Sequence, residues 1–238
     1  MTGKKKHDGP QFYGRRRGHK LRSGRQALID GLLPRLRLTL PPDGQPLDLG
    51  DAFADPVSDI WLEVGFGGGE HLAALAAAHP DIGFIGCEPF VNGVANVLSL
   101  IESGGLTNVR IFDDDVRKLF PVLPDAAFGR IIALFTDPWP KKRHHRRRFI
   151  NDDTVLQLSR LLKDGGDLRL ASDHMGYVDW MLDHLTARNE LIWEARSKHD
   201  WTTPPSDWVE TRYERKAKAK GIHPTFLCFS RRPRPADA

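Results

Sequence analysis

The chain has few cysteines and no long apolar run, and each shortage argues against a class of protein. Only two of its 238 residues are cysteines. Cys87 and Cys228 both stand in apolar runs typical of strands, so we expect buried thiols rather than a disulfide or a metal site. No stretch approaches the roughly 18 apolar residues of a membrane span, and the first residues lack the apolar segment of a secretory signal. We therefore expect a cytoplasmic protein with no membrane partner and no metal.

Several catalytic signatures are missing as well. The sequence contains no G-x-S-x-G elbow, no phosphate-binding P-loop and no H-E-x-x-H motif, which leaves hydrolase and phosphotransferase functions without support. Hydrophobic residues make up 40% of the chain and charged residues 28%, which are ordinary values for a folded domain. The sequence leaves open whether the chain is a monomer or a homodimer.

Charge is unevenly distributed along the chain. Counting Lys and Arg against Asp and Glu, residues 1–26 carry +8 (nine minus one), residues 27–140 carry −10 (six minus sixteen) and residues 141–238 carry +6 (twenty minus fourteen), which sum to the net charge of +4. Both flanks attract polyanions, whereas the centre repels them. This segregation indicates a nucleic-acid partner held by the flanks and a different, cationic or neutral, ligand in the centre.

The chain divides into four segments by composition. Residues 1–26 are polar, glycine-rich and basic, and are predicted to form a disordered arm. Residues 27–57 are expected to pack on the core as an N-terminal extension, residues 58–232 to form the main domain and residues 233–238 to be a tail. In the main domain, short apolar runs alternate with longer amphipathic ones. This alternation predicts an α/β, Rossmann-like, doubly wound fold with a mostly parallel sheet of about seven strands.

One predicted helix has clear boundary signals. Asn151 or Asp152 can cap the start of the helix in TVLQLSRLLK, and Gly165-Gly166 is expected to end it.

Acidic residues follow the predicted strands of this domain. They are Glu63, Glu88, the run Asp113 to Asp115, Asp137 and Asp173. In doubly wound sheets, ligands bind outside the carboxyl ends of the strands. We therefore expect these carboxylates to surround one ligand site.

A glycine-rich loop, E-V-G-F-G-G-G-E-H, follows the first predicted strand. Gly65, Gly67 and Gly69 allow a tight turn and the close approach of a ligand. The dinucleotide fingerprint G-x-G-x-x-G requires glycine where Glu70 stands, and that carboxylate opposes a pyrophosphate, so NAD is disfavoured. The G-x-G-x-G form preceded by an acid resembles the loop of S-adenosylmethionine-dependent methyltransferases. An acidic pocket suits that cofactor, which carries a sulfonium and an ammonium but no phosphate. Glu88 is placed to accept ribose hydroxyls, and Asp115 to meet the adenine amino group.

Four motifs together resemble the bacterial tRNA (guanine-N7)-methyltransferase family, which is of the class I S-adenosylmethionine-dependent type. They are E-x-G-x-G-x-G from Glu63, then Glu88, the block D-P-W-P-K-K-R-H from Asp137, and T-R-Y-E at 211–214. The similarity covers roughly residues 58 to 230. It implies methyl transfer from S-adenosylmethionine to N7 of the variable-loop guanine of tRNA. Thr136 departs from the family, many of whose members have proline before the aspartate.

The resemblance also assigns roles to individual residues. The cofactor contacts fall on Glu63, Glu88, Asp115 and Asp137, beside the glycines Gly65, Gly67 and Gly69, and Asp137 is also the catalytic position. The tRNA-site positions fall on Lys141, Asp173, Thr211, Arg212, Tyr213 and Glu214.

The D-P-W-P block is followed by a dense basic run. Its cations Lys142, Arg143, Arg146, Arg147 and Arg148 follow Lys141, and we expect them to neutralise RNA phosphates next to the chemical site. Trp139 either stacks on a base or packs under the loop. His144 and His145 are not a convincing metal pair because cations surround them.

Two other functions stay open from the sequence. D-P-W-P distantly resembles the D-P-P-W loops of amino methyltransferases that act on adenine or cytosine. A non-catalytic RNA-binding module of the same fold is a second alternative, against which the intact glycines and acids argue.

Overall fold

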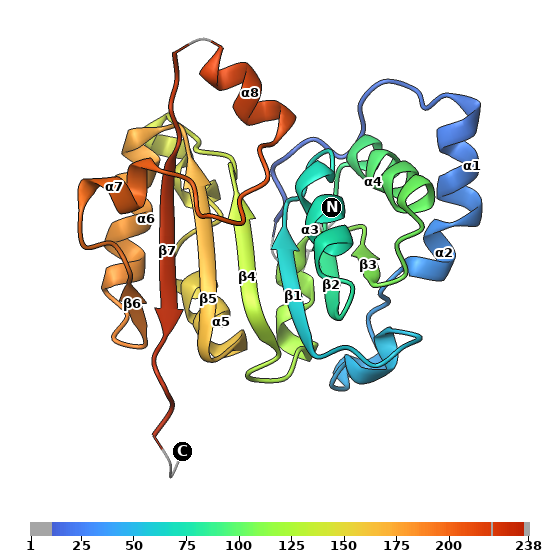
Figure 1. Ribbon diagram of the computed structural model, residues 1–238, viewed down its shortest axis with the longest axis horizontal. Helices are drawn as coiled ribbons and strands as arrows, with labels where there is room; N and C mark the ends of the chain where they lie inside the picture. The colour runs from blue at the N-terminus through green and yellow to red at the C-terminus, as the bar shows by residue number, and fades with distance from the viewer. Residues whose placement is uncertain (1–10, 220, 236–238) are drawn as a thin grey trace, which may run out of the picture.

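A seven-stranded sheet forms the centre of the molecule, with strand order β3-β2-β1-β4-β5-β7-β6 (Figure 1). The computed structural model describes residues 11–219 and 221–235. The strands are β1 Asp59–Val64, β2 Ile82–Cys87, β3 Val109–Phe112, β4 Phe128–Leu134, β5 Leu162–Ser172, β6 Leu191–Trp193 and β7 Thr225–Arg231. Strands β1 to β5 pair in parallel, and β7 runs antiparallel to both β5 and β6. The predicted doubly wound, mostly parallel sheet is confirmed.

Helices cover both faces of this sheet. They are α1 Ser23–Gly31, α2 Leu33–Leu36, α3 Glu70–Ala78, α4 Val91–Gly104, α5 Asp152–Leu161, α6 Met175–Thr186, α7 Lys198–Thr202 and α8 Arg212–Lys218. Neighbouring residues of one strand serve opposite faces: Ile131 packs in the core under α5 and α6, whereas Ile132 packs in the core under α3 and α4. Burial on both faces explains the continuous apolar run of β4. Within the described residues, none of the helices is both long and apolar enough to span a membrane.

The sheet order places a switch point between β1 and β4. From β1 the chain proceeds outward to β2 and β3, then returns to β4 on the other side of β1. Ligands of such sheets bind at the carboxyl ends of the strands where the winding reverses. The site is therefore expected beyond Val64 and Leu134.

The predicted start of α5 is confirmed, and its predicted end is wrong. Asn151 caps the helix by accepting from the Thr154 backbone N–H. The helix ends at Leu161 because Leu162 is already extended and pairs with Phe128 of β4. Gly165 and Gly166 instead lie in an irregular part of β5, where Gly165 has a φ of +75°.

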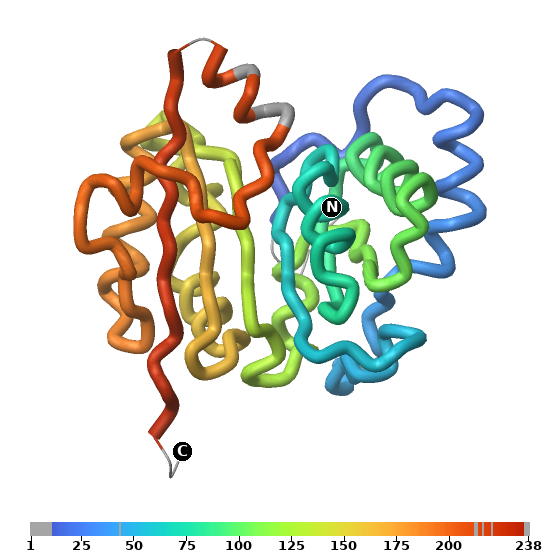
Figure 2. Tube along the Cα trace, viewed as in Figure 1, coloured from blue at the N-terminus to red at the C-terminus, as the bar shows by residue number. Residues whose placement is uncertain are grey.

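Residues 11–22 lie along the carboxyl edge of the sheet (Figure 2). Arg16 forms an ion pair with Asp114 at 2.8 Å, and its carbonyl accepts from the Val91 backbone N–H at the start of α4. Gly18 donates its backbone N–H to Asn92. These partners are distant in sequence, so the composition of the arm did not reveal them. Residues 1–10 lie outside the described part of the chain.

Candidate active site

Two cavities lie on either side of the glycine loop. The first, of about 570 Å³, is lined by Glu63, Gly65, Gly67, His71 and Thr211 among others. The second, of about 330 Å³, is lined by both loop glycines together with Glu88, Asp115, Asp137, Trp139 and Arg147. The four predicted cofactor acids therefore gather around one loop. This is the clustering that the strand-end pattern predicted.

Glycine is required at the three loop positions for different structural reasons. Gly65 and Gly67 have φ values of +69° and +55°, and a side chain at either would point into open space. Gly69, with a φ of +78°, faces α4, where an added Cβ would lie 2.4 Å from Val97. Gly69 is not among the residues that line the two cavities. Its role in the described structure is to let α3 and α4 pack closely.

Glu88 joins the end of β2 to the loop. Its carboxylate accepts from the backbone N–H groups of Gly67 and Phe90, each at 2.9 Å. Burial raises the pKa of Glu88 and the charge of Asp137 adds to that, while the two hydrogen bonds oppose it. Because an ionised carboxylate has about four lone-pair positions, Glu88 retains capacity for a ligand hydroxyl.

Asp115 is held more tightly than its sequence position indicated. Its side chain accepts from the Arg117 backbone N–H and forms an ion pair of 2.5 Å with the Arg117 guanidinium. Only 5% of Asp115 is exposed. It lines the second cavity, but with its carboxylate already engaged.

Asp137 stands in a constrained loop after β4. Phe135 and Trp139 both have positive φ values, +52° and +41°, a rare conformation for bulky residues that is typical of functional sites. Thr136 hydrogen-bonds to the Tyr177 hydroxyl at 2.9 Å, which ties this loop to α6. Asp137 is exposed at the cavity, yet desolvation by the surrounding protein raises its pKa.

The cations of the basic run lie in three environments: exposed, at the wall of the second cavity, and buried. Lys141, Lys142, Arg143 and Arg146 are exposed. Arg147 lines the second cavity, with its guanidinium 4.7 Å from the Tyr13 ring centroid and 4.9 Å from that of Trp139. Trp139 therefore contacts neighbouring side chains on the cavity wall.

The prediction that Arg148 contacts the RNA backbone is wrong for this structure. Arg148 is only 2% exposed. It donates to the Pro138 carbonyl at 2.8 Å and lies over the rings of Tyr177 and Trp180. Its guanidinium is engaged in the interior, where it braces the D-P-W-P loop through the Pro138 carbonyl.

The predicted tRNA-site residues are only partly brought together. Thr211 lines the first cavity and caps α8 by accepting from the Glu214 backbone N–H. Glu214 is fully buried and accepts from the Trp208 indole at 2.7 Å. Asp173 lies at the end of β5, where His174 rather than Asp173 caps α6. The side chains of Arg212 and Tyr213 lie outside the described part.

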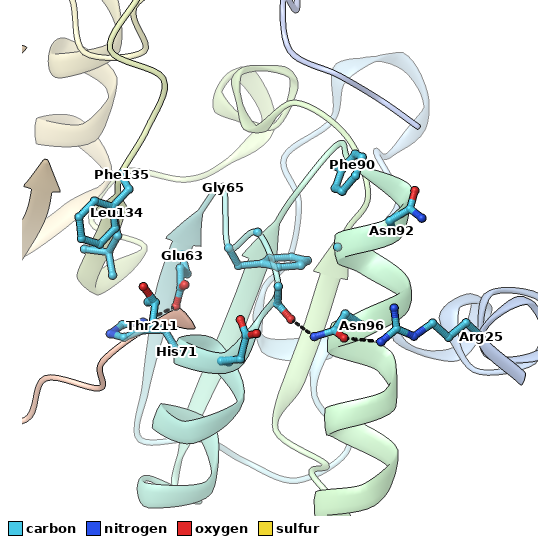
Figure 3. A pocket seen from close by; sticks show the side chains of 15 residues that line it. Arg25, Glu63, Gly65, His71, Phe90, Asn92, Asn96, Leu134, Phe135 and Thr211 are labelled. Carbon is cyan, nitrogen blue, oxygen red and sulfur yellow. Dashed lines mark hydrogen bonds and ion pairs between the residues drawn. The ribbon is translucent and has the colours of Figure 1, made fainter. Parts of the chain in front are cut away.

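Several residues at the cavities were missed. Figure 3 shows Glu63, His71 and Thr211 gathered at one end of the first cavity, and Arg25 with Asn96 at the other. The histidine was visible in the sequence as the residue after Glu70, in the first turn of the predicted helix. Nothing local indicated Tyr13 or Arg25, because tertiary packing alone brings the arm to the site.

The two cysteines and the histidines form no metal centre in the described residues. No group of three or more His, Cys, Asp or Glu side chains there could hold an ion. Burial, together with the charges of Asp115 and Glu88, raises the pKa of the Cys87 thiol. Desolvation and four neighbouring cations lower the pKa of His144, so it gains charge less readily than an ordinary histidine.

The chain is similar to known methyltransferases. A model of a family described as "Putative methyltransferase" matches residues 58–226. A tRNA (guanine-N(7)-)-methyltransferase of Rhodospirillum rubrum is 52% identical over 229 residues, covering 95% of this chain and 90% of that protein. A protein of the same name from Chelativorans sp. is 47% identical over 220 residues, covering 92% and 94%.

Solved structures support the fold. The 16S rRNA methyltransferase KamB superposes with a TM-score of 0.54 at 14% identity, covering 74% of this chain and 89% of that one. An rRNA methylase from Streptococcus thermophilus superposes with a TM-score of 0.52 at 13% identity, covering 78% and 92%.

Proposed function

This chain belongs to the methyltransferase family of the tRNA (guanine-N(7)-)-methyltransferases, and from that premise we propose that it methylates N7 of a variable-loop guanine in tRNA with S-adenosylmethionine as donor. The observation that carries the proposal is the position of Asp137. It lines the same cavity as Glu88 and Asp115, and the exposed cations that begin at Lys141 follow within four residues.

The cavity residues fit such a donor. Gly65 and Gly67 leave open space where side chains would stand, and the acids around them suit a ligand with a sulfonium and an ammonium. When bound, S-adenosylmethionine supplies an electrophilic methyl group whose bond to sulfur breaks as the N7 lone pair attacks, leaving S-adenosylhomocysteine. We assign Glu63, Glu88 and Asp115 to holding it, with Gly65 and Gly67 giving room.

Asp137 acts as an electrostatic group in this proposal. Guanine N7 carries no proton, so the reaction needs no strong base. It needs alignment of N7 with the methyl group and a negative charge beside the base, which becomes cationic. The constrained backbone from Phe135 to Trp139 and the brace from Arg148 hold the Asp137 carboxylate in place.

The exposed cations supply the grip on RNA. We assign Lys141, Lys142, Arg143 and Arg146 to phosphate contacts, with Arg147 at the cavity wall. They draw a polyanion to a site whose own acids repel it. Asp173 and Thr211, together with Arg212 and Tyr213, remain proposed contacts to the substrate nucleotide. We further propose residues 58–232 as the methyltransferase domain.

Mass spectrometry of nucleosides from tRNA incubated with the purified protein and isotopically labelled S-adenosylmethionine tests the proposal. We expect label on N7 of guanosine. Label on an exocyclic amine of adenosine or cytidine would support the amino-methyltransferase alternative. No label, with no heat in a calorimetric titration with S-adenosylmethionine, would support a non-catalytic RNA-binding module.

A further inference from the structure

A chain of contacts connects the T-R-Y-E segment with the carboxylate at the first cavity. Glu63 Oε2 lies 2.8 Å from His71 Nδ1, and the two residues are 3% and 5% exposed. Because an ionised carboxylate only accepts hydrogen bonds, the His71 Nδ1 donates. His71 also contacts Trp208, and the centroids of the two rings lie 5.6 Å apart. The Trp208 indole in turn donates to Glu214 Oε2 at 2.7 Å.

We propose that His71 and Trp208 are positioning residues for Glu63, and that Glu214 acts on the cofactor end of the site through them rather than by touching the target base. This inference rests on the proposed function, and on Glu63 being the carboxylate that meets the cationic end of S-adenosylmethionine.

The position of Glu214 favours this role over a direct contact. Its side chain is 0% exposed, with Oε2 on the Trp208 indole and Oε1 2.8 Å from the Lys218 ammonium. A carboxylate enclosed in this way cannot reach a nucleotide unless α8 moves. Thr211, three residues earlier, does line the cavity with Glu63 and His71 (Figure 3). The segment therefore faces the cavity with its first residue and the interior with its last.

Trp208 is well placed to transmit an orientation because its loop is fastened to the sheet. The preceding Asp207 binds Arg130 of β4 at 2.8 Å and Arg169 of β5 at 2.5 Å. The Trp208 ring packs edge-on against Phe226 of β7, with centroids 4.8 Å apart. With the backbone held, the hydrogen bond to Glu214 sets the rotation of the indole against His71. Side chains that hold a ligand-binding group by hydrogen bonding and packing keep it in its productive geometry.

Titration calorimetry with S-adenosylmethionine and the full-length protein, without tRNA, tests the inference. His71→Leu removes the donor to Glu63, and we expect affinity to fall about tenfold or more, the range of a lost hydrogen bond to a charged group. His71→Asn places an amide donor near the Nδ1 position and should recover most of the affinity. Trp208→Phe keeps a ring but loses the indole donor, and should weaken binding by about threefold to tenfold.

Two substitutions of Glu214 separate the roles. Glu214→Gln keeps an acceptor for Trp208, so we expect a smaller loss of cofactor affinity than in Glu214→Leu. Glu214→Leu loses the acceptor and should weaken cofactor binding as Trp208→Phe does. Glu210→Gln is the matched control, because the Glu210 carboxylate contacts Lys218 but not Trp208, and its affinity should not change. Thermal unfolding of each variant establishes that it is folded.

The opposite result is equally clear. Wild-type affinity in Trp208→Phe, or a large loss of kcat with intact cofactor binding in Glu214→Gln, would overturn the inference. A wild-type protein that binds no S-adenosylmethionine would instead overturn the proposed function, which is a different outcome in the same experiment.

Discussion

Asp137 and Asp207 are two acids near the same strands, held in opposite ways. Desolvation raises the pKa of Asp137 at the cavity. Burial alone would also raise the pKa of Asp207, but the hydrogen bonds and charges of Arg169 and Arg130 outweigh it and lower that pKa to about 2. Asp207 is therefore stabilised as an ion and fastens a loop. The surroundings of Asp137 disfavour its charged form, which is typical of groups at functional sites.

The arginine after the D-P-W-P block sharpens this difference. Arg148 is close in sequence to Asp137, yet its guanidinium is directed to the Pro138 carbonyl and two aromatic rings. It supports the backbone of the loop rather than pairing as Arg130 and Arg169 do with Asp207. The chain thus uses cations to fix structural acids and to brace the site.

The largest expected effect comes from neutralising Asp137. Asp137→Asn keeps the shape and removes the charge that stabilises the cationic base, so we expect the single-turnover rate of methyl transfer to fall by about 10²–10³, the usual loss for one electrostatic group. Asp207→Asn, measured beside it at saturating S-adenosylmethionine, should lose much less of the rate. A rate within about tenfold of wild type for Asp137→Asn would contradict the assigned role.

A smaller effect is expected in the basic run, where exposed and buried cations can be compared. The double variant Lys142→Gln, Arg143→Gln removes two exposed charges, so the negative slope of log K against log salt for tRNA binding should become shallower by about 1.4–1.8. Cofactor affinity should stay the same.

Arg148→Met is the matched comparison for that experiment. It removes one buried charge, so we expect a lower melting temperature and an unchanged salt slope. If the salt slope changed equally per charge in Arg148→Met and in the double variant, Arg148 would contact RNA and would not stay buried in the complex.

The acidic half of the site was predictable from the sequence for a physical reason. Strand ends follow from local alternation of apolar runs, and a parallel sheet brings those ends to one edge. Glu63, Glu88 and Asp137 therefore needed no knowledge of tertiary contacts. The glycine loop was predictable for a similar reason, because its backbone conformation depends on its own glycines.

The remaining features depend on packing between distant segments. Tyr13 and Arg16 are brought to the site by contacts with Trp139 and Asp114. These partners lie about a hundred residues away in sequence, so no local pattern indicates the contacts. Arg148 looks like its exposed neighbours in a basic run, and only the rings of Tyr177 and Trp180 explain its burial. Glu214 likewise resembles a substrate contact in the sequence, and only its hydrogen bond with Trp208 shows that it faces the interior. A charge run or a motif indicates chemistry, but not which of its side chains face inward.

The smallest expected effect is on stability, and it has opposite signs for the two aspartates. The folded-state pKa of Asp207, about 2, lies below its ordinary value of 3.8, so its contribution is present above pH 4 and is lost as pH falls toward 2. Asp207→Asn should lower the melting temperature at pH 7 by about 1–3 °C, as for an ion pair worth up to about 1 kcal/mol. In this variant, less stability should be lost between pH 4 and pH 2 than in wild type.

The raised pKa of Asp137 has the opposite effect on stability, because folding disfavours its ionised form. Asp137→Asn should therefore melt at the same temperature as wild type or slightly higher at pH 7. A lower melting temperature for Asp137→Asn than for Asp207→Asn would mean that Asp137, too, is held as a structural ion, and the contrast between the two acids would be lost.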